Sequence, residues 1–283
     1  MSPPVSGFIS GSPRLHYLEW DGTRAEAQTI VLVHGNSANA WWWRYVAEAL
    51  DGPGLRVIAM DLRGHGDSAW IRPSAYSPHD YTDDIAGLIC ELKIARPIVV
   101  GHSMGAVATI AFADRFPTMA RAIVAVDVPV TSTPRRNRYL RHLKALPTVT
   151  YPDLATALRS FRLMPDEGAI PPEVLIEVAK KSLMRTEDGG YTLKFDRESF
   201  FGSDGIDVAA TIARLKVPLL LLRAGESRIM LAEAAAKAVT SNPLVQLRTI
   251  PDAHHHLPLE RPLEVARAIA EFARATRAEV ASV

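Results

Sequence analysis

Short apolar runs alternate with amphipathic stretches along most of the chain. Each run is bounded by Gly, Pro or polar residues, and such short continuous runs are typical of strands buried on both faces of a parallel sheet. The runs lie at residues 29–34, 56–61, 97–102, 121–127, 217–223 and 245–250. The pattern therefore predicts a mostly parallel sheet whose strands are separated by helices.

The stretch SPHDYTDDIAGLICELKI, residues 77–94, shows helical spacing, with Ser77 placed to cap the helix and Pro78 in its first turn. Its apolar residues share one face, namely Tyr81, Ile85, Leu88, Ile89 and Leu92. Strands alternating with such helices imply right-handed crossovers and an α/β fold. A functional site is then expected at the carboxyl ends of the strands.

Residues 131–205 interrupt this alternation and contain helical patterns without a strong buried strand. We expect a core of residues 1–130 and 206–283 and a helical insertion, 131–205, that folds over the strand ends as a lid. Phe161 and Met164 are the candidates there for contact with a substrate, although packing is the usual role of apolar residues. A basic run in the insertion offers guanidinium groups to a carboxylate, although a solvated helix face is the usual role of such a run; they belong to Arg135, Arg136, Arg138 and Arg141.

Composition narrows the classes of partner. A chain of 283 residues, 48% of them hydrophobic, is long enough for one large core, and a net charge of +1 argues against binding nucleic acid or an anionic membrane surface. The single cysteine, Cys90, rules out an internal disulfide, and no apolar stretch approaches the length of a membrane span. The first residues do not resemble a secretion signal. We expect a cytoplasmic protein, monomeric or homodimeric, that acts on a small molecule and water.

The sequence GHSMG, residues 101–105, carries the strongest chemical signal. It lies between an apolar strand and a convincing helix, the setting in which Gly-x-Ser-x-Gly forms a tight turn that raises the serine above the sheet. Gly101 and Gly105 leave room for that turn, and Ser103 becomes a candidate nucleophile. The amide of Met104, at the start of the helix, is placed to bind an oxyanion.

Four motifs together resemble the α/β-hydrolase superfamily over almost the whole chain: LVHGN (32–36), DLRGHGDS (61–68), GHSMG (101–105) and PDAHHHLPLERP (251–262). The resemblance implies a mostly parallel central sheet flanked by helices, with an inserted helical lid. It also implies an oxyanion hole built from the amides of Asn36 and Met104. The family spacing of histidine, six residues and proline, counted back from Pro262, implies that His255 is the base.

The histidine loop also raises the question of a metal. Three histidines are adjacent at 254–256, but neighbours on one loop rarely converge on a single ion. No metal and no cofactor is expected.

The acid that orients the histidine is less obvious. The family usually carries it in the loop after the strand at 217–223, where Arg228 replaces the expected acid and Glu226 is the remaining carboxylate. Asp127 ends the strand that follows the elbow helix, so its side chain should open onto the same edge of the sheet. Some haloalkane dehalogenases place the acid likewise. Asp127 is preferred, and Glu226 stays open as its competitor.

A serine nucleophile disfavours dehalogenation, although Asn36 and the tryptophans at 41–43 resemble a dehalogenase entrance. The expected reaction is hydrolysis of a carboxylic ester or lactone of a small, largely apolar substrate by Ser103, His255 and Asp127, with Trp41 as a further substrate contact. Three alternative activities would use the same residues and stay open: a thioesterase, a carbon–carbon bond hydrolase and a cofactor-free perhydrolase. A ligand-binding, receptor-like protein with little turnover is the alternative of another class.

Overall fold

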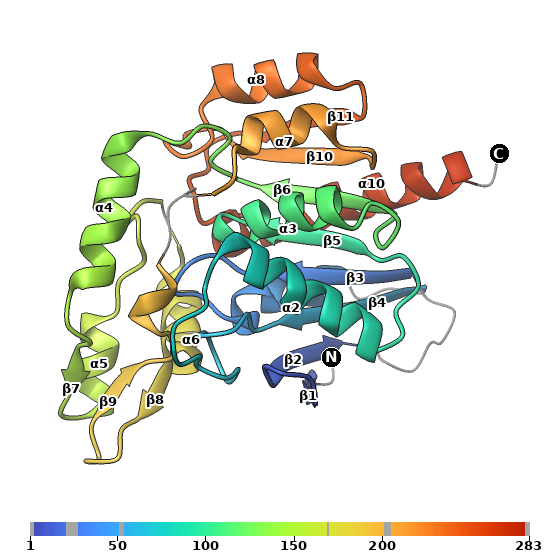
Figure 1. Ribbon diagram of the computed structural model, residues 1–283. Coiled ribbons are helices and arrows are strands. Elements are labelled where there is room, and N and C mark those ends of the chain that lie inside the picture. The colour runs from blue at the N-terminus through green and yellow to red at the C-terminus, as the bar shows by residue number, and fades with distance from the viewer. Residues whose placement is uncertain (1–2, 21–27, 51–53, 169, 201–204, 281–283) are drawn as a thin grey trace.

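An eight-stranded, mostly parallel sheet forms the centre of the protein in a computed structural model, which describes residues 3–20, 28–50, 54–168, 170–200 and 205–280 (Figure 1). The strand order is β1-β2-β4-β3-β5-β6-β10-β11. The parallel strands are those predicted from the apolar runs: β3 (Gln28–Val33), β4 (Leu55–Met60), β5 (Ile98–His102), β6 (Ala122–Val126), β10 (Leu219–Ala224) and β11 (Val245–Ile250). An antiparallel hairpin of β1 (Val5–Ile9) and β2 (Leu15–Trp20) extends the sheet beside β4 and was not predicted.

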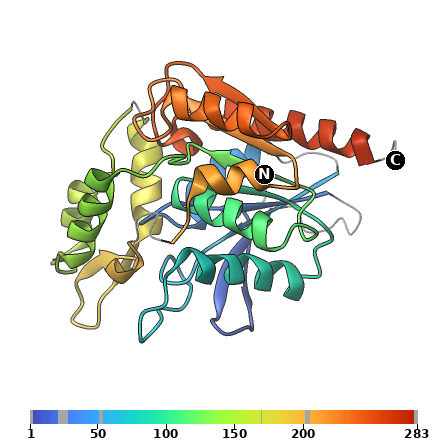
Figure 2. The same ribbon diagram turned by 45° about the horizontal axis from the view of Figure 1, so that its top comes forward.

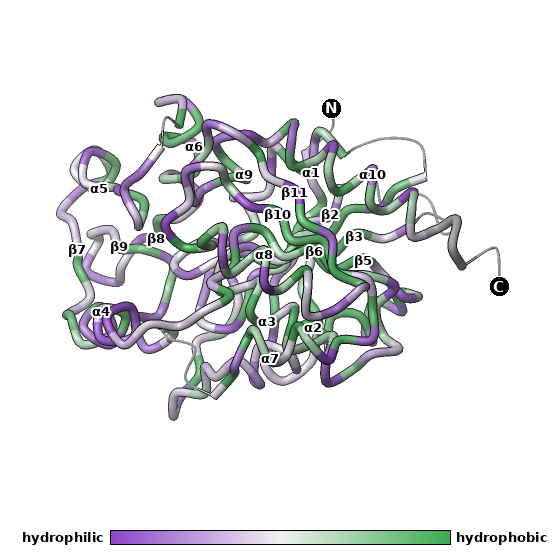
Figure 3. The backbone as a smooth tube through the Cα atoms, turned by 90° about the horizontal axis from the view of Figure 1, so that it is seen from above, coloured by the Kyte–Doolittle hydropathy of each residue, from purple (hydrophilic) through white to green (hydrophobic). Residues whose placement is uncertain are grey.

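Helices cover both faces of the sheet, which gives the α/β sandwich expected from the sequence (Figures 1 and 2). One apolar cluster joins the sheet to α2 (Pro78–Glu91), α3 (Met104–Arg115), α7 (Val208–Arg214) and α8 (Ala232–Ser241). A second cluster joins the opposite face to α1 (Arg44–Leu50), the short α9 (Leu257–Glu260) and α10 (Pro262–Val280). The middle strands β5 and β6 are buried along their whole length, and the tube is mostly green, that is hydrophobic, in this part of Figure 3. Within the described residues, no helix is both long and apolar enough to cross a lipid bilayer.

The edge strand β11 departs from the predicted pattern. Only its first and last residues, Val245 and Ile250, are buried, and the four between them are exposed. Its composition predicted burial on both faces, but β11 is the last strand at one edge of the sheet and stays largely exposed.

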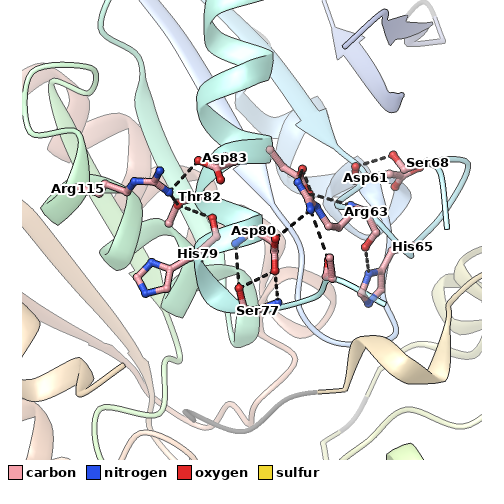
Figure 4. A network of polar contacts seen from close by, with 12 residues as sticks. Asp61, Arg63, His65, Ser68, Ser77, His79, Asp80, Thr82, Asp83 and Arg115 are labelled. Atoms are coloured by element: carbon pink, nitrogen blue, oxygen red, sulfur yellow. Dashed lines mark hydrogen bonds and ion pairs between the residues drawn. The ribbon is translucent and has the colours of Figure 1, made fainter. Parts of the chain in front are cut away.

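Helix α2 begins where the sequence predicted, at a capping box between Ser77 and Asp80. Arg63, in the turn after β4, reaches this end of the helix and forms ion pairs with Asp80 at 3.2 Å and Asp84 at 2.6 Å (Figure 4). These contacts fix the glycine-rich turn against α2, next to the loops that carry the candidate site.

The insertion contains the predicted helices and, in addition, a small sheet. The helices are α4 (Pro134–Ala145), α5 (Leu154–Ser160) and α6 (Pro172–Ser182), followed by the 3-10 turn η2 (Arg197–Ser199). Strands β7 (Thr150–Tyr151), β8 (Leu183–Arg185) and β9 (Tyr191–Leu193) pair in the antiparallel order β7-β9-β8. These strands are too short to show a period in the sequence. In Figures 1 and 2 these elements gather beside one end of the main sheet.

Candidate active site

Ser103 occupies a tight turn between β5 and α3. Its backbone, at φ 53° and ψ −115°, lies where L-residues are strained by about 1–3 kcal/mol. A Cβ atom on Gly101 would lie 2.3 Å from the carbonyl oxygen of Gly105, and one on Gly105 would lie 2.3 Å from that of His34. No side chain fits at either glycine, so the spacing in GHSMG follows from the packing of this turn.

Ser103, His255 and Asp127 form a hydrogen-bonded chain. The Oγ atom of Ser103 lies 3.0 Å from Nε2 of His255, and Nδ1 of His255 lies 2.7 Å from Oδ2 of Asp127. The carboxylate accepts from Nδ1–H, which leaves Nε2 as the acceptor for the serine hydroxyl. The three residues follow β5, β6 and β11, strands on the same half of the sheet.

Asp127 is fully buried, and the loop after β10 holds its carboxylate in place. The amide of Ala224 donates to Oδ1 at 3.2 Å, and the hydroxyl of Ser227 donates to Oδ2 at 2.7 Å. Ser227 itself accepts hydrogen bonds from the amides of Ile229 and Met230. The loop that usually carries the acid thus supplies a hydroxyl that supports an acid from the neighbouring strand. Sequence reasoning missed Ser227, whose only signal is its place in that loop.

The competing carboxylate, Glu226, lies apart from this chain. It is exposed, and its amide donates to the carbonyl of Ala253. Arg228 is 85% exposed and lies 3.8 Å from Glu167. The structure therefore brings Asp127, and not Glu226, to His255.

The histidines around His255 have separate partners. His102 donates through Nε2 to the carbonyl of His255 at 2.8 Å, which anchors the backbone of that residue. His254 lies 3.3 Å from Glu260, and His256 donates through Nε2 to the carbonyl of Pro165. The three adjacent imidazoles thus contact different groups, and these contacts do not form a metal centre.

The two residues predicted to form an oxyanion hole, Asn36 and Met104, lie near Ser103. The backbone at Gly35 packs closely on Ser103, since a Cβ atom on Gly35 would lie 3.1 Å from that of the serine. His34 donates from Nδ1 to the carbonyl of Gly35, and its Nε2 accepts an amide of the turn after β4, which fixes this loop. Asn36 lines the cavity, and Met104 is the first residue of α3, where amides have no partner within the helix.

A cavity of about 290 Å³ opens onto Ser103 and His255. The core contributes Trp42 and Ile229, and the insertion contributes Met164 and Phe200. Helix α4 supplies four more side chains of the wall, those of Arg136, Tyr139, Leu140 and Leu143. An adjoining cavity of about 270 Å³ shares Trp42, Leu143 and Met164 with the first and is lined largely by the insertion.

Two of the three predicted substrate contacts, Trp41 and Phe161, do not line the cavity at Ser103. Trp41 does not line the catalytic cavity; its ring lies 4.0 Å from the ammonium group of Lys181, and the neighbouring Trp42 faces the cavity instead. Phe161 lines only the adjoining cavity, whereas Met164 lines both. A short 3-10 turn over residues 40–43 sets which tryptophan faces inward, and the sequence pattern does not show that turn.

Burial determines the charges of the buried pair formed by His255 and Asp127. It lowers the pKa of His255 to about 3, with a further contribution from the positive charge of Arg136, and raises the pKa of Asp127 to about 6. At neutral pH the carboxylate is therefore ionised and the imidazole neutral. This is the protonation state in which His255 is able to take a proton from Ser103.

Two buried acceptor atoms among the described cavity residues have no hydrogen-bond partner, Oδ1 of Asn36 and Nδ1 of His256. Burial lowers the pKa of His256 to about 4, so the ring is neutral and Nδ1 keeps its lone pair. A ligand with an N–H or O–H group would satisfy either atom.

A second Ser–His–Asp chain lies outside the cavity and has a different setting. His16 lies 2.9 Å from the hydroxyl of Ser6 and 2.7 Å from Asp61. Asp61 also accepts the amides of Ala40 and Asp67, which joins the β1–β2 hairpin to the loops after β3 and β4. Ser6 stands on an edge strand without the tight turn of Ser103, and we assign the cluster a structural role.

Comparison with known proteins identifies the family and the fold. The model of the alpha/beta hydrolase family matches residues 30–268. An esterase, Rv0045c of Mycobacterium tuberculosis, is 28% identical over 80% of this chain and 74% of its own, and a 2-(acetamidomethylene)succinate hydrolase of Mesorhizobium japonicum is 29% identical over 76% and 77%. The crystal structure of an E-2-(acetamidomethylene)succinate hydrolase superposes with a TM-score of 0.81 at 25% identity and covers 96% of this chain and 99% of that one.

Proposed function

The chain belongs to the alpha/beta hydrolase family, and from that premise we propose that it hydrolyses a carboxylic ester or lactone through a covalent acyl-serine intermediate. The similar proteins named as esterases and hydrolases support hydrolase activity in general. One observation carries the finer proposal: the serine, histidine and aspartate are hydrogen-bonded in sequence at the wall of a cavity.

The proposed reaction begins when Ser103 attacks the carbonyl carbon and His255 takes the hydroxyl proton at Nε2. Asp127 stabilises the imidazolium that forms, and the amides of Asn36 and Met104 bind the tetrahedral oxyanion. The intermediate collapses as His255 returns the proton to the leaving alcohol. A water molecule, deprotonated by His255, then attacks the acyl-serine. As the second tetrahedral intermediate collapses, His255 returns this proton to Oγ of Ser103, and the carboxylic acid is released.

Rapid mixing with an activated short-chain aryl ester tests this proposal. We expect a burst of aryl alcohol close to one equivalent of protein, followed by slower turnover, because acylation precedes hydrolysis of the acyl-serine. Tight, saturable binding without release of the alcohol would contradict the proposal and favour a ligand-binding protein.

The pH dependence follows from the buried pair. We expect kcat/KM for a neutral ester to rise through an apparent pKa near 6, the value to which burial raises Asp127, and to level off above it. Below that pKa a proton on the pair removes the charge that stabilises the imidazolium, so activity is present only above it. His102, His256 and Arg136 also face the pair, and burial keeps both histidines neutral.

A pH–rate profile, with circular dichroism at each pH to confirm folding, checks this expectation. A rate that stays constant well below pH 6 while the fold persists would contradict the role given to the pair.

The two cavities make a prediction about chain length. Met164 is 42% exposed and lies where the cavities meet, so Met164→Ala is expected to join them and shift the preferred acyl chain to longer esters at little cost in stability. Phe161 is buried, and Phe161→Ala should lower the free energy of unfolding by about 3 kcal/mol. Values of kcat/KM for an ester series, with melting temperatures, measure both effects. An unchanged preference in Met164→Ala would assign that side chain to packing alone.

A further inference from the structure

Arg136 is set apart from the other basic residues of α4. Arg135 and Arg138 are exposed and do not line the cavity, whereas Arg136 is partly buried and lines it together with Ser103 and His255. The sequence favoured a solvated helix face for the whole run. In the structure, one arginine of this run, Arg136, lies in the wall of the cavity that holds the candidate nucleophile.

Within the described part of the chain, the guanidinium of Arg136 has no counter-charge. Among the described residues, no carboxylate lies within ion-pair distance of Arg136, and the described residues that line the cavity include no Asp or Glu. Other arginines of the protein have such partners: Arg63 pairs with Asp84 and Arg214 with Asp114. The unmatched positive charge therefore belongs to the cavity itself.

An unpaired, desolvated cation destabilises a folded protein, so its presence in a cavity calls for a ligand. Burial lowers the pKa of Arg136, yet guanidinium groups remain protonated in proteins. The surrounding wall is largely apolar, with Leu140, Leu143 and Phe200 among its residues. Such a wall strengthens the attraction between the guanidinium and an entering anion.

The positive charge of Arg136 also affects the protonation of the catalytic histidine. The positive charge of Arg136 lowers the pKa of His255, which disfavours the imidazolium that must form in the reaction. A negative group bound to Arg136 would cancel this effect. A substrate that carries an anion is thus expected to gain in both binding and turnover.

We propose that Arg136 binds a carboxylate of the substrate, and that the preferred substrate is an ester or lactone with a free carboxylate joined to the reacting carbonyl by a short apolar linker. The planar guanidinium matches a carboxylate by two parallel hydrogen bonds, and its single charge balances a monoanion. The reaction class in this statement rests on the proposed function, whereas recognition of the carboxylate does not.

A matched pair of substrates tests the inference. The first is the mono-p-nitrophenyl ester of adipic acid, and the second is p-nitrophenyl isooctanoate, in which an isopropyl group replaces the carboxylate. The measured quantity is the ratio of kcat/KM for the charged ester to that for the neutral ester. In Arg136→Met this ratio is expected to fall about 10- to 100-fold, the usual worth of a hydrogen-bonded charge, and Arg138→Met on the same helix should leave it unchanged.

Ser103→Ala separates recognition from chemistry. Calorimetry with adipate as the ligand should show binding to Ser103→Ala that is lost when Arg136→Met is added. If both esters are hydrolysed but Arg136→Met leaves the ratio of their kcat/KM values unchanged, the anion site is overturned and ester hydrolysis is still supported. If adipate binds in a way that depends on Arg136 but neither ester is hydrolysed, the anion site is supported and the proposed function is overturned.

Discussion

Ser103→Ala and His255→Ala are each expected to lower kcat/KM by several orders of magnitude, with little change in the melting temperature. The two side chains lie 3.0 Å apart and act in one proton transfer, so removing either abolishes the same step. For the same reason the double variant should be no worse than the single ones. Steady-state kinetics with the best ester measures kcat/KM, and thermal unfolding measures the melting temperature.

His254→Ala is the matched control for the histidine loop. His254 is partly exposed and pairs with Glu260, so this variant should keep most of the activity. A variant of His254 that loses more activity than His255→Ala would move the base by one residue. Ser103→Ala with activity within a few-fold of the unchanged protein would contradict the assignment of the nucleophile.

Asp127→Asn is expected to fold and to lose about 10⁴-fold in turnover, the loss known for the same change in a serine protease. The neutral amide keeps the size of the side chain but stabilises the wrong tautomer of His255 and no longer offsets the imidazolium charge. Glu226→Gln should stay near the activity of the unchanged protein, because Glu226 is exposed and lies apart from the hydrogen-bonded chain. Kinetics and melting temperatures of the two variants form the comparison.

The reverse result, a large loss in Glu226→Gln and a small one in Asp127→Asn, would place the acid in the loop after β10. Equal retention of activity in both would indicate that a Ser–His pair works without an acid.

The parallel sheet was predictable because each buried strand is a continuous apolar run, as in β5 and β6. The hairpin of β1 and β2 was not, since β1 is largely exposed and its pairing depends on the chain returning beside β4. The strands of the insertion are two or three residues long and have no detectable period. What local patterning determines was predicted, and what depends on pairing with distant segments was missed.

The candidate site divides in the same way. Ser103 was predicted from its tight turn, Asp127 from its place at a strand end, and His255 from the resemblance of its loop. The cavity wall was not predictable, because which face of α4 turns inward depends on how the insertion packs on the core. Periodicity does not single out Arg136 from Arg138, and only the three-dimensional arrangement makes it part of the cavity.

Ser103 is expected to form a covalent acyl intermediate. Treatment of the folded protein with a fluorophosphonate, followed by mass spectrometry of its peptides, tests this directly, since the reagent reacts with an activated serine. We expect one adduct, located on Ser103, formed in step with the loss of esterase activity and absent after mild heat unfolding. Full loss of activity with Ser103 unmodified, or modification of Ser103 with esterase activity intact, would show that Ser103 is not the nucleophile.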